Sequence, residues 1–323
     1  MENWRKELRV DPIPRLISAK NKAIAYFTRR DILDEKVEPI ETLWELPEIK
    51  KIFNRQQENG SWKYPGGGKE HLRSQEDYDQ IETYRILGKL VEEYGLNNKH
   101  PKIRKTADYL FHHQTAEGDF RGIYGNQYSP NYSAAIMELL IKAGYQNNSH
   151  IEKGFNWLLS IRQNDRGWAI PLRTVNAKYA DIMNTDTMQP DLVKPFSHLI
   201  TGVVLRAFAA HPKYRNSKEA IKAGELLASR FFQKDTYPDR QTPDFWARVR
   251  FPFWFTDIVS ALDSLSLMGF TEDNPNIHGA LNRLKSRQED DGLFDLKLQK
   301  GKDEDLKFWV CLAICRLFKR FYI

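Results

Sequence analysis

The side chains that could carry chemistry do not form one of the common catalytic groupings. The sequence contains no phosphate-binding loop, no Ser-His-Asp order and no cluster of Cys and His with metal-ligand spacing. Cys311 and Cys315 lie one helical turn apart in an apolar segment, so they cannot supply the four ligands of a zinc site or bridge within a helix. We expect both thiols to fill the core. The sequence therefore predicts no metal site and no cofactor.

Arginines and aromatic residues are the more informative candidates. In the run from residue 245 to 255, Arg248 and Arg250 alternate with apolar residues, which is hard to explain as an ordinary solvated face. This run overlaps one of two long segments, residues 171–194 and 234–252, that interrupt an otherwise regular pattern of helices. Long loops in a compact domain are usually functional or disordered, and these contain too many aromatic residues for disorder. We expect both loops to be functional.

A repeated turn indicates the scaffold that positions these residues. Four segments share the order Gln, three residues, Gly, and then an aromatic residue one or two positions later. A Gly shortly after a helix supplies a backbone position with positive φ, so the chain can reverse without steric cost and the aromatic ring can pack. The four copies are Gln56, Gly60 and Trp62; Gln114, Gly118 and Phe120; Gln163, Gly167 and Trp168; and Gln288, Gly292 and Phe294.

Amphipathic runs surround these turns. Apolar residues recur with a helical period, as Ile151, Phe155 and Leu158 do before the third turn. A single repeat cannot bury its own apolar face, so the repeats must share one core. We predict one domain over residues 1–323, in which residues 1–40 form a degenerate first helical pair. Helices are expected at 46–56, 101–114, 150–163, 217–233 and 276–288 before the turns, and at 78–94, 130–143, 195–210, 253–268 and 304–320 after them.

The repeated turn resembles the QW repeats of the squalene-hopene cyclase and prenyltransferase superfamily. Members of that superfamily fold as an α/α toroid, with an inner ring of helices around a pocket and an outer ring outside it. The repeats cover roughly residues 40–323 of this chain. The resemblance therefore implies an all-α chain, an α/α toroid of helical hairpins joined by QW-type turns.

The resemblance also implies where a pocket would lie, because the helix after each turn begins at the central cavity in that superfamily. At such positions this chain carries four candidates for acid or base chemistry, Asp79, His198, Asp257 and Asp305. Helix N-termini attract anions, and arginines in the adjoining loops would reinforce that attraction. An aromatic cup with arginines at its mouth suits an apolar molecule with an anionic head, such as an isoprenoid diphosphate. The expected ligand-binding residues are Tyr128, Tyr132, Trp254, Trp309, Arg121, Arg173, Arg248 and Arg250.

Each candidate also has a purely structural interpretation. Asp79, Asp257 and Asp305 are good N-cap or first-turn residues, worth about 1 kcal/mol there without any other role. His198 lies on a largely apolar helix, where a histidine is more often part of the core than a catalyst. The tyrosines and tryptophans could close the centre of the fold as core. The sequence alone leaves both interpretations open.

The catalytic signatures of the superfamily are missing. Class II terpene cyclases use an Asp-x-Asp-Asp acid, and this chain offers only Asp77 with Asp79 and Asp303 with Asp305, each without the adjacent second Asp. Protein prenyltransferases hold zinc through Asp, Cys and His, and no such context surrounds Cys311. The sequence therefore leaves open whether the chain is an enzyme.

Composition limits the partners and the location. The net charge is +6, from 49 Lys and Arg against 43 Asp and Glu, and the basic residues are interleaved with acids instead of forming a stripe for nucleic acid. No apolar run approaches the length of a membrane span or of a signal-peptide core. We therefore expect no nucleic-acid partner, no membrane span and a cytoplasmic protein.

Three functions remain open. The first is a terpene cyclase-like or prenyltransferase-like toroid that acts on or binds an isoprenoid-like or other anionic small molecule. The second is a non-catalytic scaffold that binds a ligand or a peptide, which would imply a protein partner. The third is a glycan-active α/α toroid, an inference from fold analogy alone.

Overall fold

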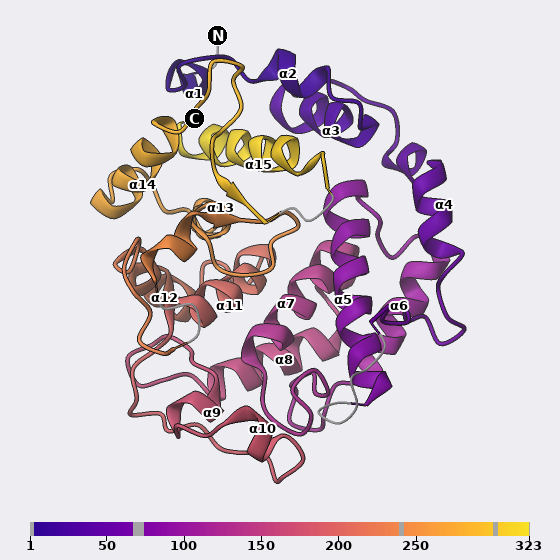
Figure 1. Cartoon of the computed structure of the whole chain (residues 1–323), viewed down its shortest axis with the longest axis vertical. Helices are drawn as coiled ribbons and strands as arrows, with labels where there is room; N and C mark the ends of the chain where they lie inside the picture. Colours follow the sequence, from indigo (N-terminus) through magenta and orange to yellow (C-terminus); the bar gives the residue numbers. More distant parts are fainter. Residues whose placement is uncertain (1–2, 67–73, 239–241, 300–302, 323) are drawn as a thin grey trace. The chain divides into compact units, whose positions relative to one another are not determined.

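The computed structural model describes residues 3–66, 74–238, 242–299 and 303–322, and these residues are predominantly helical (Figure 1). They divide into two compact units, Ile40–His211 and the combination of Met1–Pro39 with Pro212–Ile323. We call them the middle unit and the terminal unit. Residues 239–241 of the second long loop, and the ends of the predicted domain at 1–2 and 323, lie outside the described residues. The predicted all-α class is confirmed.

The middle unit consists of helical hairpins. Its helices α7 and α11 pack against each other, and α11 is buried on nearly every face, as expected for a helix that is apolar all round (Figure 1). The short helices α9 and α10 lie inside the first long loop. The elements are η2 (a 3₁₀ helix, Ile40–Glu45), α4 (Pro47–Phe53), α5 (Gln75–Tyr94), α6 (Pro101–His112), α7 (Pro130–Leu140), η3 (a π-helix, Ile141–Tyr145), α8 (Ser149–Ser160), α9 (Pro171–Thr174), α10 (Tyr179–Ile182) and α11 (His198–Ala210).

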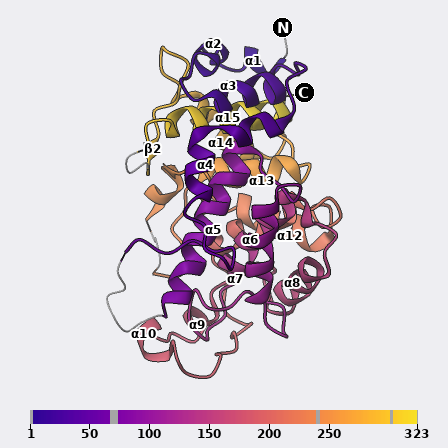
Figure 2. The same cartoon turned by 90° about the vertical axis from the view of Figure 1, so that its right-hand side faces the viewer.

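The terminal unit combines the two ends of the chain. Helix α15 packs against α1, α2, α3, η1 and α13, so the first and last helices share one core (Figure 2). The short strands β1 and β2 pair in parallel, with Arg248 opposite Lys297. The elements are α1 (Asn3–Lys6), α2 (Ile13–Ile17), α3 (Lys22–Phe27), η1 (a π-helix, Thr28–Ile32), α12 (Lys218–Ala228), η4 (a 3₁₀ helix, Pro243–Ala247), β1 (Arg248–Val249), α13 (Ile258–Leu267), α14 (Pro275–Lys285), β2 (Lys297–Leu298) and α15 (Leu306–Phe321).

The glutamine of each turn ties its own hairpin to another segment. Gln56 Nε2 donates to the Gly60 carbonyl at 3.1 Å and to the Lys102 carbonyl in the first turn of α6 at 2.9 Å. Gln114 repeats this arrangement, because its Nε2 donates to the Gly118 carbonyl and to a carbonyl in the first turn of α8, both at 2.8 Å. One side-chain amide thus closes the turn and ties it to the first turn of another helix.

The glycines of the turns do not all play the expected role. Gly60 has φ +92°, and a Cβ there would lie 2.3 Å from the Lys105 carbonyl oxygen, so both conformation and space demand glycine. The expectation of a positive φ is wrong at Gly167, because the left-handed residue of that turn is Arg166, with φ +83°. Gly167 is required for space instead, since a Cβ there would lie 2.5 Å from Phe196 Cβ.

The last turn binds the N-terminal segment. Gln288 Nε2 donates to the Val10 carbonyl at 2.8 Å, and Gln288 Oε1 accepts from the Val10 amide at 3.1 Å. Arg9 Nη2 adds a hydrogen bond to the Gln288 carbonyl at 2.6 Å. The start of the chain therefore occupies, beside the last turn, the place that the next hairpin occupies beside the earlier turns.

A further turn after Gln233 lies between the third and the last of these four turns, and it departs from the pattern because it has no glycine at the corresponding position. Gln233 Nε2 donates back to the Ser229 carbonyl at 2.7 Å and binds no neighbouring hairpin in the described part of the chain. Trp246 of the second long loop is buried and donates from Nε1 to the Gln233 carbonyl at 3.0 Å. Phe232 adopts φ +60°, which is uncommon for a bulky residue. A tryptophan 13 residues after Gln233, in the long loop that follows it, thus replaces the aromatic residue of the regular turns.

Candidate functional site

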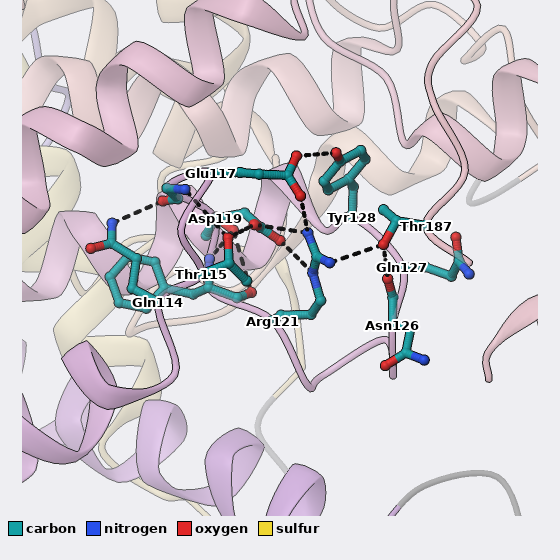
Figure 3. Close-up of polar contacts among 12 residues, drawn as sticks. Gln114, Thr115, Glu117, Asp119, Arg121, Asn126, Gln127, Tyr128 and Thr187 are labelled. Atoms are coloured by element: carbon teal, nitrogen blue, oxygen red, sulfur yellow. Dashed lines mark hydrogen bonds and ion pairs between the residues drawn. The ribbon is translucent and has the colours of Figure 1, made fainter. Parts of the chain in front are cut away.

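Arg121 and Tyr128, two predicted ligand-binding residues of the middle unit, meet in one polar cluster (Figure 3). Arg121 donates from Nε and Nη2 to the two Asp119 carboxylate oxygens, both at 3.0 Å, and from Nη1 to Thr187 Oγ1 at 2.9 Å. Its guanidinium carbon lies 5.0 Å from the centre of the Tyr128 ring. The Tyr128 hydroxyl is hydrogen-bonded to Glu117, which also pairs with Arg121 at 3.2 Å.

This cluster is saturated by its own members. Burial raises the pKa of the Tyr128 hydroxyl, and the Glu117 carboxylate raises it further, so the phenol stays a neutral donor. Burial would lower the pKa of Arg121, but the two carboxylates outweigh burial and raise it. The arginine is therefore charged and already balanced by Asp119 and Glu117. An external anion would have to displace them, so the geometry favours a structural clamp on residues 182–189 over a ligand site.

Asp79 is occupied by hydrogen bonds from the chain. Its carboxylate accepts from the Tyr64 amide at 2.8 Å, from Gln75 Nε2 at 2.7 Å and from Gln57 Nε2 at 3.1 Å. The residue lies in α5, one turn after its capped start, and is 9% exposed. Asp79 thus fixes the segment after the first turn onto α5, which leaves its proposed acid role without geometric support.

The other predicted residues of the middle unit lie on α7, α11 and α9. Tyr132 packs edge-on against Tyr84 and Tyr124, with ring centres 6.0 and 5.4 Å apart. His198 is the first residue of α11 and is 7% exposed. Arg173 lies in α9. Their predicted roles in catalysis or ligand binding stay predictions.

Asp257 in the terminal unit caps α13. Its Oδ1 accepts from the Val259 and Ser260 amides, both at 2.9 Å, and Ser260 Oγ accepts in turn from the Asp257 amide at 3.0 Å. This reciprocal pair is a capping box, and the residue is 2% exposed. Asp257 is therefore the N-cap of α13.

The basic and aromatic run forms local stacks. Arg248 is exposed and lies over the Phe245 ring at 4.4 Å, and Arg250 lies over the Trp254 ring at 5.6 Å. Trp309 of α15 is 1% exposed and stacks on Phe251, with ring centres 5.6 Å apart. Trp309 thus belongs to the core of the terminal unit.

Asp305 is the predicted acid that lines a pocket. It precedes α15, makes no side-chain capping bond, and accepts from Asn21 Nδ2 at 2.9 Å. The pocket has a volume of about 550 Å³, within the range of small-molecule sites. We call it the α15 pocket. Its lining residues come from both ends of the chain and are Arg15, Ser18, Ala19, Lys20, Leu298, Glu304, Asp305, Lys307 and Phe308.

Cations and one aromatic ring dominate the α15 pocket. The Arg15 guanidinium carbon lies 5.6 Å and Lys307 Nζ 5.4 Å from the centre of the Phe308 ring, and Lys20 lines the same space. Two carboxylates oppose these three cations, and Asp305 is one of them. The pocket also lies at the N-terminus of a 16-residue helix, whose dipole adds a partial positive charge.

Most of this pocket was not predicted from the sequence. Lys20 belongs to a small basic cluster that is typical of a solvated helix face, and Arg15 and Lys307 lie near opposite ends of the chain. The available signal was the last turn, because its Gln288 needs a segment to bind, as the glutamines of the earlier turns do. The segment that binds there leads directly into Arg15.

The cysteines behave as expected of core residues. Both are free and fully buried, and burial raises the pKa of the Cys311 thiol well above its usual range. Among the described residues, no three or more His, Cys, Asp or Glu side chains gather in a group that could hold a metal ion. None of the described helices is long and apolar enough to span a membrane.

Comparisons with known proteins identify the scaffold. The family model of the squalene-hopene cyclase C-terminal domain matches residues 76–190 and, in an overlapping segment, residues 133–307, which together make up more than half of the chain. No curated protein matches. This match and the hairpins above bear out the predicted fold class, an all-α chain of the α/α toroid type.

Two solved structures are distantly similar. One is described as a novel alpha-amylase from Clostridium perfringens, with 16% identity, 87% of this chain and 86% of that chain covered, and a TM-score of 0.41. The other is a protein from Actinoplanes, with 13% identity, 87% and 99% covered, and a TM-score of 0.32. Both likenesses are too weak to support an argument about activity.

Proposed function

The chain belongs to the family of the squalene-hopene cyclase C-terminal domain, and on this premise we propose that it binds a small molecule with an anionic head and an apolar body in the α15 pocket. The observation that carries the proposal is that Arg15 and Lys307, from opposite ends of the chain, lie over one aromatic ring, and that Lys20 lines the same pocket. An isoprenoid diphosphate is the chemical class that combines both features.

Charge and size both support this ligand class. Lys20 and Lys307 are exposed, so they can turn toward a ligand without breaking the core. Lysine and arginine side chains form the strong, charge-assisted hydrogen bonds that phosphate oxygens prefer. Phe308 offers an apolar surface beside them. A diphosphate would thus sit among the cations while its hydrocarbon chain covers the ring.

Binding has better support than catalysis. Asp79, Asp257 and Asp305 each accept hydrogen bonds from the chain, and a carboxyl group that acted on a ligand would have to give up these contacts. Class II terpene cyclisation needs a carboxylic acid that is positioned to donate its proton to the alkene. The non-catalytic scaffold is therefore the form of the function that the geometry favours.

Isothermal titration calorimetry with farnesyl diphosphate tests the proposal. Farnesol and inorganic diphosphate are the matched probes that carry only the body or only the head. We expect Lys20→Ala and Lys307→Ala each to weaken binding by about 1 kcal/mol, or fivefold, because both side chains are exposed and screened. The control Lys222→Ala removes an exposed lysine of α12 outside the pocket and should bind as the wild type does.

Two results would overturn the proposal. Farnesol that binds as tightly as farnesyl diphosphate would show that the anionic head is not recognised. A Lys20→Ala/Lys307→Ala double variant with wild-type affinity would place the ligand outside the α15 pocket.

A further inference from the structure

A second cavity of the terminal unit lies beside the strand pair, and we propose that it binds a small carboxylate with a compact apolar body the size of one aromatic ring. The cavity has a volume of about 180 Å³. It is lined by α14 and by residues around β2. One residue each of η4 and α13, and one residue of the segment after α12, complete the lining. It shares no lining residue with the α15 pocket, so the inference does not depend on the function proposed above.

The body of the cavity is apolar. Ala280 and Leu284 of α14 and Ile258 of α13 form a wall whose members are at most 2% exposed. Phe232 and Leu296 complete the apolar lining. An engineered apolar cavity of about 150 Å³ holds one benzene molecule. The present cavity therefore accommodates a single substituted ring, and it is too small for a long isoprenoid chain.

Cations surround the apolar body. Arg283, Arg287 and Lys297 line the cavity against a single carboxylate, Asp295. Arg287 lies 3.7 Å from Asp295, and both side chains are more than half exposed, so this pair is weak. Lys297 is already paired with an acid of η4 at 3.1 Å. The lining thus has an excess of positive charge.

Arg283 is the residue that specifies an anion. Its guanidinium carbon lies over the Phe232 ring, 4.3 Å from the ring centre, and both residues line the cavity. Within the described ranges, no carboxylate forms an ion pair with Arg283. A planar guanidinium in this position presents two parallel N–H groups, the arrangement that a carboxylate matches. A ring that carries a carboxylate would place its apolar body against Leu284 and its charge at Arg283.

The cavity lies beside the Gln233 turn, which departs from the regular pattern. Phe232, one of the lining residues, adopts a left-handed conformation there, and the long loop supplies Trp246. The small side chain of Ala247 leaves the space between η4 and α14 open. Residues in such sparsely populated conformations cluster at ligand sites, where the surrounding structure holds them in place.

Fluorine NMR with 4-fluorobenzoate as the probe tests this inference. We expect saturable line broadening with the wild-type protein. Arg283→Met keeps the length of the side chain but removes its charge, and it should weaken binding at least about tenfold. Ala247→Phe fills the cavity from its partly exposed rim and should abolish binding. Arg55→Met, at an exposed position of the middle unit, is the matched control and should leave binding unchanged.

The outcomes separate binding from misfolding. Melting temperatures close to that of the wild type confirm that the variants are folded, and Arg283 is exposed enough that its variant tests the inference even if Ala247→Phe unfolds. The neutral isostere 4-fluorobenzyl alcohol should bind at least about tenfold more weakly than the carboxylate. Equal binding of the alcohol, wild-type binding by the Arg283→Met variant, or no saturable binding of the carboxylate would each overturn the proposal.

Discussion

Replacement of Trp168 by alanine should destabilise the protein strongly, because this ring fastens a turn to the helix before it. The side chain is fully buried, its Nε1 donates to the Leu158 carbonyl at 2.7 Å, and its ring centre lies 5.5 Å from that of Phe208. Truncation of a buried tryptophan to alanine costs about 3 to 5 kcal/mol through lost contacts and the remaining cavity. Set against a total stability of about 5 to 15 kcal/mol, this is a large fraction.

A second variant separates the ring from its hydrogen bond. Trp168→Phe keeps most of the apolar volume but leaves the Leu158 carbonyl without its donor, which should cost about 1 to 3 kcal/mol. The backbone hydrogen bond from the Trp168 amide to Thr201 Oγ1, at 2.9 Å, is retained in both variants. The expected order of stability is therefore wild type, Trp168→Phe, Trp168→Ala.

Urea unfolding, followed by both circular dichroism and fluorescence, measures these differences. Coincident transitions are needed, since a single free energy of unfolding has meaning only for a two-state transition. Val193→Ala, at a side chain that is 80% exposed, is the control and should stay within about 0.5 kcal/mol of the wild type. A Trp168→Ala variant as stable as that control would refute the reasoning, as would a Phe variant that costs as much as the Ala variant.

Three further predictions follow from the turns and the buried charges. Gly60→Ala should lower the free energy of unfolding by about 2 kcal/mol or more, because the φ of Gly60 is +92° and a carbonyl of α6 lies 2.3 Å from the new Cβ. A melting temperature equal to that of the wild type would contradict this. Gln288→Ala should speed hydrogen exchange at the Val10 amide, because that amide donates a hydrogen bond to Gln288 Oε1 in the wild type. Exchange at the wild-type rate would show that other contacts hold the N-terminal segment. Burial would raise the pKa of Glu138, but Arg206 and a neighbouring lysine lower it below its usual value. The stability that this lowered pKa contributes is present above about pH 4.3 and is lost as the pH falls further. The difference in unfolding free energy between the wild type and Glu138→Gln should therefore shrink in acid, and a difference that is constant with pH would refute this prediction.

The sequence predicts the helices well because their periodic faces and their turns agree. The range expected at 101–114 is α6, Pro101–His112, and the range expected at 150–163 is α8, Ser149–Ser160. Both helices end before the predicted glutamine because that glutamine belongs to the turn, where Gln114 pairs with Phe120. The bounds of these helices depend on residues that are close together in the sequence, so they can be predicted from it.

The site is harder to predict because the sequence shows that a residue is charged but does not show which residue it contacts. Arg121 and Arg248 look equivalent in sequence, yet Arg121 is enclosed by Asp119 and Glu117 while Arg248 stacks on Phe245 at the surface. The α15 pocket depends on contacts between segments far apart in the sequence, such as Asn21 with Asp305, which are 284 residues apart. No local pattern encodes such a pair.

Photolabelling tests whether the α15 pocket binds an isoprenoid-like anion. The probe is a farnesyl diphosphate analogue with a diazirine in its hydrocarbon chain, and mass spectrometry maps the peptide that it modifies. We expect modification of the peptide that contains Phe308 or of the one that contains Ala19, with protection by excess inorganic diphosphate. Labelling that falls on other parts of the chain, or that diphosphate does not prevent, would contradict this expectation.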